Sequence, residues 1–132
     1  MTDNTSTVNE LLSLTQRLLN SVVTADWKTY TSLCDSTITC FEPEARGQLV
    51  EGLPFHQFYF DITEAGRRQI TVTQPHVRLL GPDAAIVSYV RLTQSTDASG
   101  SPKTSRYEET RVWQRRDGEW KHVHFHRSKP TA

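Results

Sequence analysis

The second half of this 132-residue chain alternates apolar and polar residues over long stretches, and no other feature constrains the fold as strongly. Side chains on a β-strand point to opposite faces in turn, so this alternation predicts strands with one face in a core. Pro75 interrupts the first strand, which predicts a bulge or a sheet edge there. Asp117 and Gly118 tolerate positive φ and predict a tight hairpin. The expected strands are 70–80, 84–94, 104–116 and 119–127.

The first half of the chain predicts helices. Apolar residues recur at helical spacing over residues 8–23, and their stripe is wider than one packed face requires, so this helix is expected to contact a sheet and a neighbour. Thr7 and Glu10 have capping-box spacing, which predicts a helix start at Thr7. Asp26 is expected to cap a second, short helix, and Pro54 to begin a third. Helices followed by meandering strands indicate the α+β class.

Length and composition restrict the class of protein. The length predicts a single domain over 1–132, with flexible ends at 1–6 and 129–132. Lys and Arg number 15 and Asp and Glu number 15, so no basic excess favours nucleic acid, and the zero net charge does not oppose self-association.

The sequence also predicts the compartment and the state of the thiols. It shows no leader and no apolar run of membrane-spanning length, so a cytoplasmic protein with no membrane contact is expected. Cys34 and Cys40 are expected to be free, reduced and inert in that compartment. Because the chain has no glycine-rich phosphate loop, no cofactor is expected.

Three arginines fall on the apolar faces of three predicted strands: Arg91, Arg111 and Arg127. An inward guanidinium needs an acceptor, because an unpaired buried charge is very costly. Glu109 shares a face with Arg111 and is a candidate partner, but one carboxylate does not neutralise three guanidiniums. Two interpretations stay open. The arginines form an anion-binding pocket, or they lie near strand ends and reach water or other acidic residues.

A second question is whether the histidines bind a metal ion. His122, His124 and His126 share a predicted face with Trp120, and imidazoles at i and i+2 can bind one metal ion. Because no fourth ligand is evident and an interface suits the same face, no metal site is expected. His56 lies in an aromatic cluster and is expected to be a packed residue rather than a base. We expect no catalytic residues.

Six segments occur in order along the chain: FEPEA, LVEGL, FHQFYF, EETRVW, RRDGEW and VHFHRS. Together they closely resemble the association, or hub, domain of calcium/calmodulin-dependent protein kinase II, over nearly the whole chain to about Ser128. The resemblance implies a cone-shaped fold of the cystatin or nuclear transport factor 2-like kind, in which a long N-terminal helix packs on a curved antiparallel sheet. It also implies a scaffold that assembles with itself into two stacked rings of more than ten subunits.

The resemblance further implies a site and partners. The cavity arginines of the family match Arg91, Arg111 and Arg127, and its pocket histidine matches His56, so a small carboxylate is an expected ligand, with Glu109 pairing with part of the charge. Hub subunits of kinases are expected partners. Kinase activity is not expected of this chain, and calmodulin binding is implied by the family alone.

The chain departs from the family in two ways. The 132 residues include no kinase segment before the hub-like region, and the loop after Phe60, DITEAGRRQ, is shorter than in animal kinases and lacks their tryptophan. Two alternatives on the same fold stay open: a cavity-based enzyme of the isomerase or dehydratase type, and a small-anion sensor. An enzyme needs a positioned acid or base in the cavity, and the sequence shows no clear pair of that kind.

Overall fold

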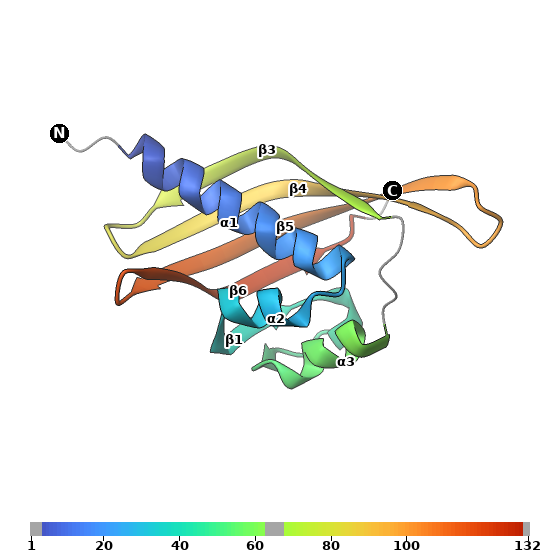
Figure 1. Cartoon of the computed structure of the whole chain (residues 1–132), viewed down its shortest axis with the longest axis horizontal. Helices are drawn as coiled ribbons and strands as arrows, with labels where there is room; N and C mark the ends of the chain where they lie inside the picture. The colour runs from blue at the N-terminus through green and yellow to red at the C-terminus, as the bar shows by residue number, and fades with distance from the viewer. Residues whose placement is uncertain (1–3, 63–67, 131–132) are drawn as a thin grey trace.

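The computed structural model describes residues 4–62 and 68–130 of the chain. Helices and one strand pair come first, and four long strands follow, as the sequence predicts for the α+β class (Figure 1). The elements are α1 (Thr5–Val23), α2 (Trp27–Leu33), β1 (Cys34–Phe41), a 3₁₀ turn (Pro43–Ala45), β2 (Val50–Glu51), α3 (Pro54–Ile62), β3 (Gln69–Leu79), β4 (Ala84–Thr96), β5 (Pro102–Arg116) and β6 (Glu119–Ser128).

The six strands form one sheet in the order β2-β1-β6-β5-β4-β3. Neighbouring strands are antiparallel, except that β1 runs parallel to β6. The sheet curves, and α1 lies across it in contact with β3 and β4 (Figure 1). This arrangement confirms the predicted long helix on a curved sheet.

The core lies between α1 and the sheet. Leu11, Leu18 and Leu19 recur at helical spacing on α1 and are fully buried, and Val87 and Trp113 face them from β4 and β5 with no exposed area. The apolar stripe of α1 continues beyond this contact. Its half-buried members are Leu12, Leu14 and Val22, which pack at the edge of the core.

The predicted start of α1 at Thr7 is wrong by two residues. The helix begins at Thr5, and the amide of Val8 donates to the Asn4 carbonyl at 3.0 Å. The capping box is therefore absent, because Thr7 lies inside the first turn and Asn4 makes no side-chain cap. Of the ends expected to be flexible, residues 5–6 are helical, whereas 1–3 and 131–132 lie outside the described residues.

The other predicted signals act as expected. Asp26 accepts a hydrogen bond from the Thr29 amide at 3.1 Å and caps α2, and Pro54 begins α3. At the sheet edge, β3 is bulged where Gln74 takes a φ of 51° before Pro75. The β5–β6 turn places both of its residues, Asp117 and Gly118, at positive φ, as its sequence predicts.

A second bulge lies in β6 and corrects one prediction. Val112 pairs with His124, but Trp113 pairs with His122, so Val123 is an extra residue that reverses the direction of the side chains before it. His122 therefore points into the core and is fully buried, whereas His126 is exposed on the opposite face beside Phe41. The shared face predicted for the histidine run is wrong.

None of the helices in the described part of the chain is both long enough and apolar enough to span a membrane.

Candidate functional site

A cavity of about 360 Å³ opens between the helices and the sheet. Helix α2 contributes Tyr30 and α3 contributes His56 and Phe60, while β4, β5 and β6 contribute the arginines. The lining includes four of the five predicted site residues: His56, Arg91, Arg111 and Arg127. The fifth, Glu109, is 2% exposed and lies behind the wall, where it holds two of the arginines.

Glu109 bridges two buried arginines. Arg91 Nη1 donates to Glu109 Oε2 at 3.0 Å, and Arg111 Nη2 donates to Oε1 at 3.0 Å. Tyr89 Oη also donates to Oε1, at 2.5 Å. Although burial raises the pKa of Glu109, the charges of Arg111 and Arg91 lower it below its ordinary value, so the carboxylate is ionised at neutral pH. The predicted pairing of Glu109 with Arg111 is confirmed.

Each of the three guanidinium nitrogens of Arg111 makes a contact inside the protein. Its Nε donates to Tyr89 Oη at 2.8 Å, and its Nη1 lies 3.3 Å from His122 Nε2. Because arginine can only donate, His122 Nε2 is the acceptor, which places the histidine proton on Nδ1. The guanidinium carbon also lies 4.5 Å from the ring centroid of Phe125. Arg111 is therefore a fixed cation in the wall.

Arg127 pairs with carboxylates that sequence reasoning did not assign to the site. Its Nη2 donates to Glu44 Oε2 at 2.5 Å and to Glu42 Oε2 at 3.2 Å. Both glutamates come from the FEPEA segment, which the parallel β1–β6 pairing brings beside Arg127. The Tyr107 ring lies near two guanidiniums, 4.9 Å from Arg127 and 5.5 Å from Arg91. The structure therefore contains features of both interpretations of the arginines. They pair with carboxylates inside the protein, and they also line a cavity.

Two further cations line the cavity and were also missed. Arg68 precedes β3, and its Nη2 is buried with no hydrogen-bond partner among the described residues. Lys103 lies at the start of β5. No sequence signal could have found them, because both lie in segments that read as loops. The loop expected to differ from animal kinases contains residues 63–67, which lie outside the described residues.

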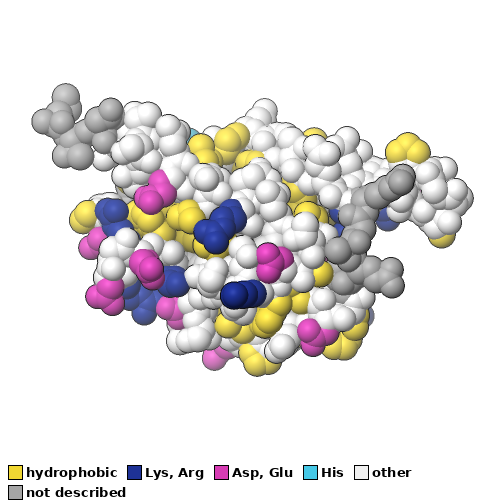
Figure 2. All heavy atoms as spheres, in the orientation of Figure 1, with side chains coloured by type: hydrophobic (Ala, Val, Ile, Leu, Met, Phe, Trp, Pro, Cys, Tyr) yellow, Lys and Arg dark blue, Asp and Glu magenta, His cyan; other side chains and the backbone are white. Residues whose placement is uncertain are grey.

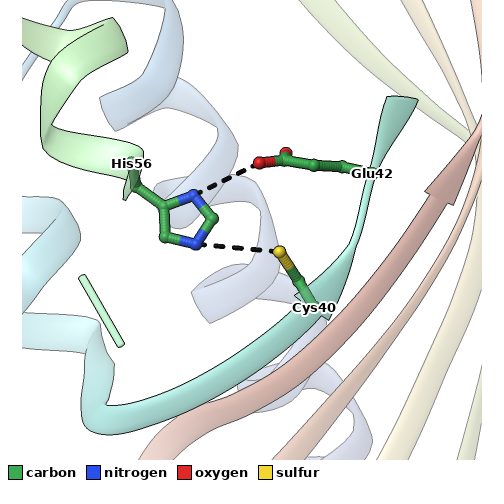
Figure 3. Close-up of side chains that lie close together, drawn as sticks. All are labelled: Cys40, Glu42 and His56. Atoms are coloured by element: carbon green, nitrogen blue, oxygen red, sulfur yellow. Dashed lines mark hydrogen bonds and ion pairs between the residues drawn. The ribbon is translucent and has the colours of Figure 1, made fainter. Parts of the chain in front are cut away.

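His56 lies between a thiol and a carboxylate (Figure 3). Its Nε2 is 3.7 Å from Cys40 Sγ, and its Nδ1 is 3.6 Å from Glu42 Oε1. Burial, with the charges of Arg111 and Arg127, lowers the pKa of His56 to about 4, so the imidazole is neutral at pH 7. His56 is buried, as predicted, but it also forms part of the cavity wall.

Both cysteines are free and buried. Burial raises the pKa of each thiol to about 12, so each is protonated at neutral pH. Cys34 Sγ lies 3.5 Å from His122 Nδ1, so each thiol contacts a buried imidazole.

The cavity is suited chemically to anions. Its described lining has five cationic side chains, from Arg68, Arg91, Lys103, Arg111 and Arg127, against the two carboxylates of Glu42 and Glu44. Guanidinium groups held in place by neighbouring carboxylates need no reorganisation to meet a planar anion.

A long helix across a curved sheet, closed around such a cavity, defines a cone of the nuclear transport factor 2-like kind. A protein of that superfamily from Salmonella enterica superposes with a TM-score of 0.76 over 97% of this chain and 94% of its own, at 21% identity. At this identity the similarity shows the fold alone.

Sequence comparison identifies the family. The sequence model of the calcium/calmodulin dependent protein kinase II association domain matches residues 7–131, and the chain belongs to this family. The rabbit calcium/calmodulin-dependent protein kinase type II subunit delta is 50% identical over an alignment 127 residues long, which covers 93% of this chain. The match spans 24% of the length of that relative.

Solved structures agree with this assignment. The association domain of the Caenorhabditis elegans kinase superposes with a TM-score of 0.92, at 43% identity, over 96% of this chain and all of its own. The hub homology domain from Chlamydomonas reinhardtii superposes with a TM-score of 0.86, at 45% identity, over 95% of this chain and 99% of its own.

The Glu109 bridge predicts a large cost for its loss. Glu109→Gln should lower the free energy of unfolding by about 3–5 kcal/mol, because Arg91 and Arg111 would stay buried without a carboxylate. Chemical denaturation at a fixed chain concentration measures this cost. The exposed neighbour Glu108 supplies the control, and Glu108→Gln should change stability by less than about 0.5 kcal/mol. Equal effects of the two changes would contradict the bridge.

The burial of His56 predicts a pH dependence. Unfolded histidine has a pKa of about 6.5, and the folded value is about 4, so the unfolded chain binds more protons between these values. Stability should therefore fall as pH drops from 6.5 to 4. Denaturation of His56→Gln across this range should show a shallower fall, by up to about 3 kcal/mol. His76→Gln, a change of an exposed histidine, should retain the wild-type profile. Identical profiles for wild type and His56→Gln would refute the assignment.

Proposed function

We propose that residues 1–132 form one association domain whose function is to assemble with copies of itself. Membership of the association domain family over residues 7–131 carries this proposal. The matched solved structures are named as association or hub domains, and they align over nearly all of this chain.

The surface supports self-association. Large apolar side chains are exposed on β1, on α3 and in the turns: Phe41, Leu49, Phe58, Ile62 and Leu80. On the face drawn in Figure 2, hydrophobic side chains gather in the lower part, over α2 and α3. The chain has no net charge to oppose contact between copies. These exposed apolar side chains are available for contacts between copies of the chain.

We further propose the form of the assembly: two stacked rings with more than ten subunits, in the cytoplasm. Hub subunits of kinases can join such rings, because closely similar subunits present closely similar contact surfaces. In this proposal the chain acts as a scaffold, and kinase activity belongs to the longer relatives.

We also propose that the cavity binds a small carboxylate. Arg127 and Arg91 make the direct contacts, since Arg127 Nε and Nη1 and Arg91 Nη2 have no hydrogen-bond partner within the described residues. Arg111, whose three guanidinium nitrogens each contact a group of the wall, contributes its charge, and Glu109 fixes both Arg91 and Arg111. Neutral His56 lines the cavity without adding charge. This site makes a small-anion sensor the second candidate function.

An enzyme of the isomerase or dehydratase type has weaker support. Similarity to distant relatives of the superfamily shows the fold alone. Glu109, the most buried carboxylate of the site, is occupied by two arginines and one tyrosine, and it is not placed to move a substrate proton.

Native mass spectrometry of the full chain tests the assembly. The expected mass exceeds ten times the 15.1 kDa of one chain, because ring closure satisfies every contact surface at once. A monomer or simple dimer at micromolar concentration would refute the scaffold proposal.

Calorimetry with acetate, propionate and succinate tests the cavity. Arg127→Gln should weaken binding by about 1.5–3 kcal/mol, the scale of a charged hydrogen bond. Arg115→Gln, which changes an arginine outside the cavity, should leave binding unchanged. Native mass of both variants confirms that assembly survives. If none of these carboxylates binds at millimolar concentration, the arginines serve the fold through internal ion pairs.

A further inference from the structure

Three metal-ligating side chains of different kinds meet at one edge of the cavity. Cys40 comes from the end of β1, Glu42 follows two residues later, and His56 comes from the first turn of α3 (Figure 3). One ligand atom of each lies within 4.8 Å of those of the other two. Cys40 is fully buried, and His56 is 5% exposed.

The spacing of the thiol and the imidazole fits one ion. With Zn–S near 2.3 Å and Zn–N near 2.0–2.1 Å, two ligands of a tetrahedral zinc ion lie about 3.6 Å apart. Cys40 Sγ and His56 Nε2 are 3.7 Å apart. We propose that Cys40, His56 and Glu42 form a binding site for a thiophilic divalent cation, of which zinc is the natural example.

The protonation of His56 suits this role. Glu42 Oε1 lies 3.6 Å from Nδ1, which is beyond hydrogen-bond distance, but its negative charge favours the tautomer with the proton on Nδ1. The Nε2 lone pair then faces the Cys40 thiol, 3.7 Å away. A carboxylate that holds the far nitrogen of a ligating histidine is a recurring feature of zinc sites. Glu42 is itself held by Arg127 through its other oxygen. The carboxylate therefore places negative charge beside the imidazole and the ion.

The site itself supplies two negative charges to the ion. Binding replaces the thiol proton of Cys40, which passes to water as the sulfur–metal bond forms. The thiolate and the Glu42 carboxylate then offset the two positive charges of the ion. Arg127 also pairs with Glu44, and Arg111 and Arg91 share Glu109. Glu42 and His56 line the cavity, so the remaining coordination positions face its interior.

The second thiol–imidazole pair of the chain supplies an internal control. Cys34 Sγ and His122 Nδ1 are also close, at 3.5 Å. There the Nε2 atom of His122 accepts from Arg111, so the proton lies on Nδ1 and that nitrogen has no lone pair for a metal. Within the described residues, no carboxylate completes this pair into a cluster of three.

Titration of the full chain with Co²⁺ tests the site, since cobalt takes the place of zinc and reports its ligands by absorption. We expect one ion per chain, a thiolate-to-cobalt charge-transfer band in the near ultraviolet, the intense visible bands of tetrahedral cobalt, and release of one proton. Zinc added afterwards should remove the bands.

Matched variants assign the ligands. Cys40→Ser should abolish the charge-transfer band, whereas Cys34→Ser should retain it. Glu42→Gln should weaken Co²⁺ binding by about 10–100-fold, the effect of losing a carboxylate that supports a ligating histidine. Glu51→Gln changes an exposed carboxylate outside the cavity and should leave Co²⁺ affinity within about threefold of wild type. Native mass spectrometry of each variant serves as the control, and each variant should assemble like wild type.

The site is refuted if Co²⁺ does not bind at submillimolar concentration, or if Cys40→Ser retains the band. Because this titration uses metal alone and the carboxylate test uses none, failure of either proposal is distinguishable from failure of the other.

Discussion

The ion pairs of Glu109 with Arg91 and Arg111 are the interaction on which the rest of the structure depends. A cone of this size places its strand faces around a cavity, and two guanidiniums on those faces would be very costly without an acceptor. Glu109 lies between them on β5 with 2% of its surface exposed, and it receives a third hydrogen bond from Tyr89. This bridge makes a cationic cavity compatible with a stable core.

Pairing of buried arginines with carboxylates also divides the cavity into two parts. Arg111 belongs to a fixed wall, and Arg127 belongs to a part with hydrogen-bond donors still available. Arg111 is fully committed to groups of the wall, whereas Arg127 uses one nitrogen for two glutamates and keeps others available. The wall supports the sheet, and the part of the cavity around Arg127 and Glu42 is where we propose that an anion or a metal ion binds. Phe58 and Ile62, two of the exposed apolar side chains, are on α3 and do not line the cavity. Assembly and ligand binding can therefore rest on separate parts of one small domain.

Sequence patterns predict local features such as strands and turns. They miss contacts between residues that only the pairing of distant strands brings together. Alternation locates the long strands and the faces of their arginines, and Pro75 marks the edge bulge because proline cannot donate to a ladder. The bulge at Val123 has no proline or glycine to mark it, so the direction of His122 was mispredicted. Glu42 was missed as a partner of Arg127 because the two residues are 85 positions apart. Only the parallel pairing of β1 with β6 brings them together, and alternation carries no information about strand order.

Electron cryomicroscopy of the assembled protein, at a resolution that shows side chains, tests the central claim most directly. The claim is that each subunit neutralises its inward arginines with its own carboxylates, so that the cavity is complete before subunits meet. The account predicts a closed two-ring particle in which every subunit retains the Glu109 bridge and no subunit contact involves the arginine cluster. A particle whose arginines pair across the interface with carboxylates of a neighbouring subunit would contradict it.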